Sequence, residues 1–255
     1  MEKNFRNFNK NTKQYELYKD MYKNQSISFV KNKILKYSKF QTKMSIKKAL
    51  SLLDTFIDPS DPDLDVPNSI HAYQTAERIR KNNSNDEELI IIGLIHDLGK
   101  VLFSFGEESY SVVGDTYVLG CEFRDSIIYN ELLEFSPEYK KYDKLGIYKK
   151  NCGLENLYLS YGHDEYLYQV LKFNKNHKIS NKYLNIIRYH SFYPWHTGGD
   201  YKEFMIESDK IILKDVNNFN KYDLYSKEDN INITNETKSF YDKLLDKYFL
   251  GDLYW

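Results

Sequence analysis

The chain has 255 residues, with 36 Lys and Arg against 37 Asp and Glu, so its formal net charge is −1. Nucleic acids and anionic membranes attract clustered positive charge, and this balance argues against both as partners. Hydrophobic residues make up 41% of the chain and include 24 Tyr and 15 Phe, which is enough apolar surface for one substantial core.

The N-terminal residues lack the continuous apolar stretch of a secretory signal. The longest apolar run, residues 89–95, is too short to span a bilayer. Cys121 and Cys152 stand alone without a paired spacing, so we expect two reduced, buried thiols. These features predict a soluble cytoplasmic protein, which we expect to be a monomer without a membrane or nucleic-acid partner.

Apolar residues recur at helical spacing along most of the chain, beginning with a stripe at Tyr15, Tyr18, Met21 and Tyr22. Asn68 and the segment 84–87 carry side chains that can cap helices. The expected helices are near 15–22, 45–56, 68–81, 84–95, 154–161, 164–173, 181–190, 201–207, 208–219 and 236–248.

Residues 109–119 are the one β-rich stretch, and the pair Gly114-Asp115 predicts a turn within a short β-hairpin. No Gly/Ser-rich or Pro-rich linker divides the chain. We therefore expect a mainly α fold in one compact domain, a helical bundle with a short β-hairpin.

His96-Asp97 ends an apolar helical run, which plants an imidazole and a carboxylate at the edge of the core. Burying the carboxylate without a partner would cost roughly 2 kcal/mol or more, and a metal ion would compensate it efficiently. The simpler alternative is a surface pair at a helix end.

The pair belongs to an ordered series of candidate ligands along the chain. Imidazole and carboxylate together suit Zn, Mn or Fe. Adjacent helical residues point about 100° apart, so Asp97 must reach sideways beside His96, as a carboxylate does when it bridges two ions. The series therefore predicts a dinuclear site with the six ligands His71, His96, Asp97, His163, His190 and Asp223.

Around these ligands the chain resembles the myo-inositol oxygenases, within the wider group of metal-dependent HD-domain proteins. The resemblance runs from about residue 58 to the C-terminus, with a shorter echo at 5–8 and its weakest part at 122–144. It rests on the stretches at 58–77 (DPSDPDLDVPNSIHAYQTAE), 93–101 (GLIHDLGKV), 113–116 (VGDT), 162–166 (GHDEY) and 189–198 (YHSFYPWHTG).

The resemblance implies an HD-domain-like di-iron core over 58–255, with 1–57 as a helical segment that packs on it and contributes to a substrate lid. It also implies an oxygenase of inositol catabolism that uses O2 and mixed-valent Fe(II)/Fe(III) to cleave myo-inositol between C1 and C6, giving D-glucuronate. The first iron would be held by His71, His96, Asp97 and Asp223, and Asp97 would bridge to a second iron on His163 and His190.

Lys100 lies four residues after His96, on the same face if the helix continues through Gly99, where its ammonium could favour a substrate alkoxide. It is the candidate catalytic residue. The positions that the resemblance assigns to the substrate are Arg6, Asp58, Lys100, Gly114, Asp115 and Ser191.

Two other functions share this ligand pattern. An HD-type phosphohydrolase would use His71, His96, Asp97 and Asp223, but carboxylates at Asp58 and Asp115 would repel phosphate. A non-catalytic scaffold is disfavoured because every ligand position carries a competent side chain.

The remaining acids and histidines are expected to be structural. Asp164 is expected to support His163 or cap a helix, and His177 and His196 lie in a polar turn and a loop. The acidic turn at 61–65 lacks the glycine and terminal glutamate of a calcium loop.

Overall fold

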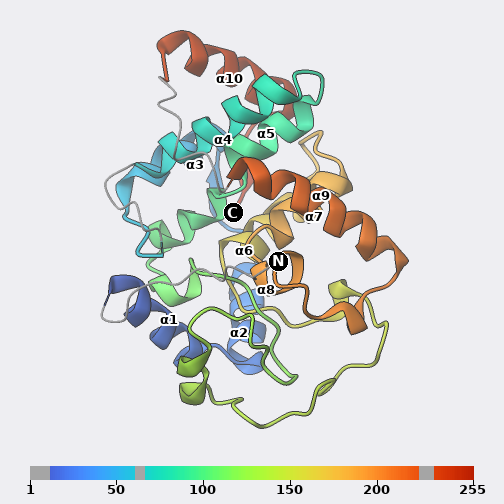
Figure 1. Ribbon diagram of the computed structural model, residues 1–255. Helices are drawn as coiled ribbons and strands as arrows, with labels where there is room; N and C mark the ends of the chain where they lie inside the picture. The colour runs from blue at the N-terminus through green and yellow to red at the C-terminus, as the bar shows by residue number, and fades with distance from the viewer. Residues whose placement is uncertain (1–11, 61–66, 224–232) are drawn as a thin grey trace.

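The computed structural model describes residues 12–60, 67–223 and 233–255, and helices dominate them, as predicted (Figure 1). The α-helices are α1 (Lys13–Asn24), α2 (Ile27–Tyr37), α3 (Ile46–Leu52), α4 (Asn68–Asn82), α5 (Glu87–Ile95), α6 (His163–Phe173), α7 (Asn181–Tyr189), α8 (Tyr193–His196), α9 (Glu207–Asp223) and α10 (Asn235–Tyr248). The 3₁₀ helices and strands are η1 (Leu53–Thr55), η2 (Leu98–Phe105), η3 (Ser109–Ser111), η4 (Asn130–Phe135), η5 (Leu154–Asn156), η6 (Lys202–Phe204), β1 (Lys43–Met44) and β2 (Leu253–Tyr254).

Side-chain caps begin several of these helices. The Asp86 carboxylate accepts a hydrogen bond from the Leu89 amide at 3.0 Å, which confirms the cap expected before α5. The prediction that Asn68 caps α4 is wrong, because Pro67 occupies the N-cap position and Asn68 is the first residue of this helix. Its amide instead donates to the carbonyl of Leu53 and ties α4 to the preceding turn.

The prediction of a β-hairpin within 109–119 is wrong, because the backbone of this segment hydrogen-bonds to another part of the chain. Residues 109–111 form η3, and the segment beyond them pairs with 158–160 through the bridge between Val118 and Leu159. Amides on both sides donate across this contact, from Leu119 to Tyr158 and from Ser160 to Tyr117. The same pairing explains why the helix expected at 154–161 is confined to η5.

The small sheet joins two distant parts of the chain. Lys43 of β1 pairs antiparallel with Tyr254 of β2. Next to it Trp255 is buried, and its indole N–H donates to the Met44 carbonyl at 2.9 Å. The C-terminal tail therefore packs on the body of the protein, as its aromatic residues predict.

The expectation of two reduced, buried thiols is met in part. Both cysteines are free thiols, but Cys121 is buried and Cys152 is partly exposed. Within the described ranges, the helices are too short or too polar to cross a membrane.

The helices that carry candidate ligands pack against one another, and Figure 1 shows them between α10 and α2. α4 packs along α5, where a Cβ on Gly93 would lie 2.9 Å from the Ala76 Cα, so only glycine permits this approach. α6 packs along α7, and α7 contacts α9. This packing brings the start of α4 and α6 together with the ends of α5, α7 and α9.

Glu107, which follows η2, connects α2 to this assembly. Its buried carboxylate accepts hydrogen bonds from the ammonium groups of Lys33 and Lys36 and from the hydroxyls of Tyr37 and Ser111. Burial by itself would raise the pKa of Glu107, but these four donors outweigh it and hold the pKa at about 2.

Because the pKa of Glu107 falls from 4.5 to about 2 on folding, its charge stabilises the fold above pH 4.5 and the contribution is lost as the pH drops toward 2. We expect Glu107→Gln to lower the free energy of unfolding by about 1–2 kcal/mol at pH 7. The difference from the parent protein should shrink below pH 4.5 in urea unfolding experiments. The exposed neighbour variant Glu108→Gln should change stability by less than about 0.5 kcal/mol; a pH-independent difference for Glu107→Gln would contradict this account.

Candidate metal centre

Four histidines meet where the helix ends converge. The ring centroids lie 5.5 Å apart for His71 and His96, 5.1 Å for His96 and His190, and 5.2 Å for His163 and His190. His96, His163 and His190 are buried, and His71 is partly exposed. The histidines that the sequence singles out therefore form one cluster.

Backbone carbonyls orient three of these rings. In each, Nδ1 lies within hydrogen-bonding distance of a carbonyl oxygen, which favours the tautomer with hydrogen on Nδ1 and leaves the Nε2 lone pair available to a metal ion. The pairs are His96 with Gly93 at 3.0 Å, His163 with Val112 at 2.8 Å and His190 with Ile187 at 2.7 Å.

The two oxygens of Asp97 face different histidines. Oδ1 lies 3.1 Å from Nε2 of His163 and 3.7 Å from Nε2 of His190. Oδ2 lies 3.6 Å from Nε2 of His96. One carboxylate thus stands between two sets of imidazole nitrogens, which is the arrangement of a bridging ligand.

Asp223, the last residue of α9, completes the set around α4 and α5. Its Oδ1 lies 3.0 Å from Nε2 of His71 and 3.2 Å from Nε2 of His96. Candidate ligand atoms lie within 4.8 Å of each other in two groups, one with His71, His96 and Asp97 and one with Asp97, His163 and His190. Imidazole nitrogen and carboxylate oxygen together fit iron, manganese or zinc.

Both carboxylates are held in the ionised form. Burial would raise the pKa of Asp97, but Lys100 and the surrounding imidazoles hold it well below its usual range. Burial likewise opposes ionisation of Asp223, while His96 and His71 hold its pKa well below the usual range. The centre therefore offers negative oxygens, as a cationic metal requires.

Lys100 reaches this centre by a different route from the expected one. α5 ends at Ile95, and the chain continues as the 3₁₀ helix η2, so the prediction that Lys100 shares a helical face with His96 is wrong. In a 3₁₀ helix residues three apart are aligned. The Lys100 ammonium accordingly donates to Oδ2 of Asp97 at 2.9 Å.

Asp58 holds the same ammonium from the other side. Its Oδ2 lies 2.7 Å from Nζ of Lys100, and its Oδ1 accepts from the amide and hydroxyl of Ser60. Burial would lower the pKa of Lys100, but Asp58 and Asp97 raise it above its usual range. Lys100 is thus a fixed cation between two carboxylates.

Gly99 makes this geometry possible. A Cβ at this position would lie 1.9 Å from the carbonyl oxygen of His163, so any other residue would separate η2 from the start of α6. The close approach brings Asp97 and Lys100 beside His163.

The other predicted substrate positions have different surroundings. Ser191 Oγ lies 3.5 Å from Nε2 of His163, next to the histidine cluster. Gly114 has φ +103°, and the neighbouring Asp115 carboxylate accepts a hydrogen bond from the Tyr18 hydroxyl at 3.0 Å. Arg6 lies outside the described residues, as does the acidic turn at 61–65.

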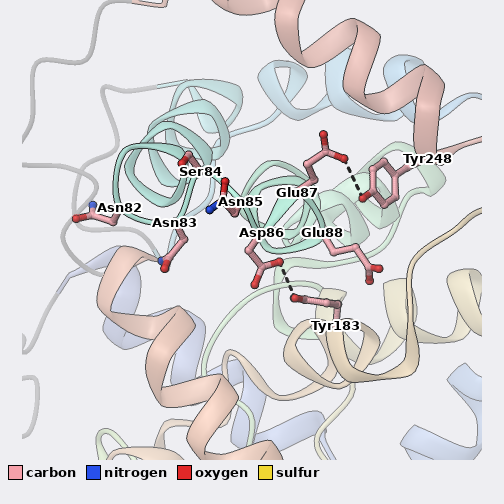
Figure 2. A pocket seen from close by; sticks show the side chains of 9 residues that line it. All are labelled: Asn82, Asn83, Ser84, Asn85, Asp86, Glu87, Glu88, Tyr183 and Tyr248. Atoms are coloured by element: carbon pink, nitrogen blue, oxygen red, sulfur yellow. Dashed lines mark hydrogen bonds between the residues drawn. The ribbon is translucent and has the colours of Figure 1, made fainter.

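A separate pocket of about 610 Å³ lies at the opposite end of α5 from His96, lined by 82–88, Tyr183 and Tyr248 (Figure 2). Its acids are engaged by protein groups: the Tyr183 hydroxyl donates to Asp86 at 2.6 Å, and Lys247 and Tyr248 donate to Glu87. These contacts tie α5 to α7 and α10, so the histidine cluster is the stronger functional candidate.

Comparison with known proteins agrees with a functional site at the histidine cluster. A profile described as myo-inositol oxygenase matches residues 11–255. The chain belongs to the myo-inositol oxygenase family. Its relatives include the inositol oxygenase of Mus musculus, 43% identical over 94% of this chain and 86% of the mouse protein. That of Danio rerio is 42% identical over 99% and 92%, and a probable inositol oxygenase of Oryza sativa is 43% identical over 98% and 85%.

In this family member, the side chains expected to be structural have clear partners. His196 Nε2 lies 2.9 Å from the His190 carbonyl, and His177 Nε2 lies 2.6 Å from that of Leu171, so both brace the backbone. Asp164 accepts from the Thr116 hydroxyl at 2.6 Å, and Val112 rather than Asp164 supports the His163 ring.

The contact between Tyr18 and Asp115 was not predicted from the sequence. The helical spacing of Tyr18 indicates a core residue, and Tyr18 is buried, but its hydroxyl also binds Asp115. Nothing local marks it among 24 tyrosines, because its partner lies far away in the sequence.

If the two groups of candidate ligands hold one ion each, we expect His190→Ala to lower the metal content from two ions to one per chain, since it removes an imidazole that faces Oδ1 of Asp97. Elemental analysis of iron-loaded protein measures this, with circular dichroism to confirm the fold. His177→Ala removes a histidine outside the cluster and should keep both ions. Two ions per chain in His190→Ala would reject His190 as a ligand.

Proposed function

We propose that this chain is an inositol oxygenase that cleaves the ring of myo-inositol between C1 and C6 with O2, giving D-glucuronate and water. Family membership supports the reaction, because the relatives in animals carry the name inositol oxygenase. The observation that carries the proposal is the buried Asp97 carboxylate, whose two oxygens face separate sets of imidazoles.

The same observation supports two iron ions per chain, in the mixed-valent Fe(II)/Fe(III) state. The first would be held by His71, His96, Asp97 and Asp223, and the second by Asp97, His163 and His190. When bound, such a pair supplies O2 activation and the Lewis acidity that makes a coordinated hydroxyl more acidic.

In this proposal Lys100 is the catalytic residue of the chain. As a cation between Asp58 and Asp97 it would stabilise negative charge that develops on a substrate oxygen. Its raised pKa keeps it protonated at neutral pH, so it would act by donating a hydrogen bond rather than by accepting a proton.

The substrate hydroxyls would be bound by Arg6, Asp58, Asp115 and Ser191, with the backbone at Gly114 close to the ring. Ser191 is supported by its place beside His163. Asp58 has the clearest partner in Lys100, which suggests that it orients this ammonium while it binds the substrate. Donors and acceptors arranged around a ring suit a polyol.

A phosphohydrolase is the weaker proposal on charge grounds. The charge of Lys100 is already balanced by Asp58 and Asp97 among the described residues of the site. The carboxylates of Asp58 and Asp115 would repel a phosphate ester, whereas they can accept hydrogen bonds from the hydroxyls of a neutral polyol.

We also propose that 1–57 and 58–255 act as one HD-domain-like unit, with the N-terminal segment contributing to the substrate lid. Leu17, Met21 and Tyr22 of α1 share a hydrophobic cluster with residues of α4 to α7, which supports one unit for the described part. We propose a cytoplasmic monomer that binds neither membrane nor nucleic acid.

The direct test incubates iron-loaded, partially oxidised protein with myo-inositol and O2. We expect one glucuronate for each O2 consumed, measured by chromatography and an oxygen electrode. The metal-deficient variant His190→Ala serves as the control and should give no product. Hydrolysis of a phosphoester by the same preparation, without glucuronate, would overturn the proposal.

Lys100→Met should retain both irons and the fold, with reduced stability because Asp58 loses its buried partner. It should lose about 100-fold or more in kcat, because the cation that stabilises the developing charge is gone. Steady-state oxygen consumption and iron analysis measure the two properties. Lys172→Met makes the same change at an exposed site on α6 and should leave kcat unchanged. An unchanged rate in Lys100→Met would remove Lys100 from the mechanism.

A further inference from the structure

One phenol hydroxyl holds both the backbone and the side chain of Asp115. The Asp115 amide donates to the Tyr18 oxygen at 3.1 Å, and the Tyr18 hydroxyl donates to Oδ1 of Asp115 at 3.0 Å. A phenol can donate one hydrogen bond while it accepts another, and here both go to the same residue. The carboxylate is thereby fixed relative to its own backbone.

The loop around Asp115 has two further polar links, both through the next residue. The Thr116 amide donates to the Ser191 carbonyl at 2.9 Å, and its hydroxyl donates to Oδ2 of Asp164 at 2.6 Å. These links fix the loop backbone beside His163 and His190. The contact from Tyr18 is made directly to the Asp115 side chain.

Tyr18 is itself held rigidly. Its side chain is buried, and its ring lies 5.5 Å from Tyr129 and 6.0 Å from Tyr22 between centroids. The helix also closes over Gly114, where a Cβ would lie 3.0 Å from Sδ of Met21. The hydroxyl is therefore presented to Asp115 from a fixed position on α1.

We propose that Tyr18 is a positioning residue that sets the Asp115 carboxylate for hydrogen bonding to a substrate hydroxyl. This inference rests on the proposed function, in which Asp115 binds the polyol. Without the phenol, Asp115 loses the two hydrogen bonds that tie its carboxylate to its own backbone, and small displacements of a binding group weaken substrate capture. Tyr18 acts through Asp115, so it affects substrate binding rather than the chemical step.

Tyr22 provides a matched control on the same helix. It is also buried, and its hydroxyl donates to the Ile128 carbonyl rather than to Asp115. Tyr18→Phe and Tyr22→Phe each remove one buried phenol hydroxyl of α1 and keep the ring. A general effect of loosening α1 would appear in both variants.

The experiment measures KM and kcat by oxygen consumption and the Kd for myo-inositol by anaerobic calorimetry, with melting temperature and iron content as checks. Tyr18→Phe should raise KM and Kd about tenfold and leave kcat within about twofold. Tyr22→Phe should leave KM, kcat and Kd unchanged. Asp115→Asn should also raise Kd, and adding Tyr18→Phe to it should have little further effect, because both changes act on one group.

An unchanged Kd in Tyr18→Phe or in Asp115→Asn, equal increases in Tyr18→Phe and Tyr22→Phe, or additive effects in the double variant would overturn the inference. Loss of iron or of the fold in Tyr18→Phe would show a structural residue and overturn it as well. If the parent protein itself neither binds nor oxidises myo-inositol, the proposed function fails and the inference with it.

Discussion

The buried charge of Asp97 is the constraint around which the described structure is arranged. A carboxylate removed from water must be compensated, or it destabilises the fold by several kcal/mol. Here Oδ1 faces His163 and His190, while Oδ2 faces His96 and the Lys100 ammonium. Because these partners come from different helices, the packing of those helices also determines how the charge of Asp97 is compensated.

The ends of the helices supply both the candidate ligands and the backbone carbonyls that orient them. The last turns of α5 and α7 present carbonyls to the rings of His96 and His190, so the same groups that end a helix orient an imidazole. Gly99 then allows η2 to touch the first residue of α6. Close packing fixes the positions of the candidate ligand atoms, which reduces the cost of assembling a metal centre.

The polar residues beyond the ligands connect this centre to the N-terminal helices. Lys100 is paired with Asp58, and Asp115 is bound by Tyr18 of α1. Lys100 lies between two carboxylates, and Asp115 accepts a hydrogen bond from a neutral phenol. The N-terminal helix α1 thus contacts a proposed substrate residue as well as packing in the core.

The sequence by itself determined most of the helices, because helical hydrogen bonds and apolar periodicity are local. It also singled out the histidines and aspartates that the fold brings into one cluster. It could not place 109–119 or 154–161, whose backbone groups pair with each other across the fold. Only the tertiary structure decided that Lys100 reaches Asp97 through a 3₁₀ turn, that Val112 supports His163, and that Tyr18 binds Asp115. These contacts join residues whose separation in sequence carries no pattern, so packing alone determines them.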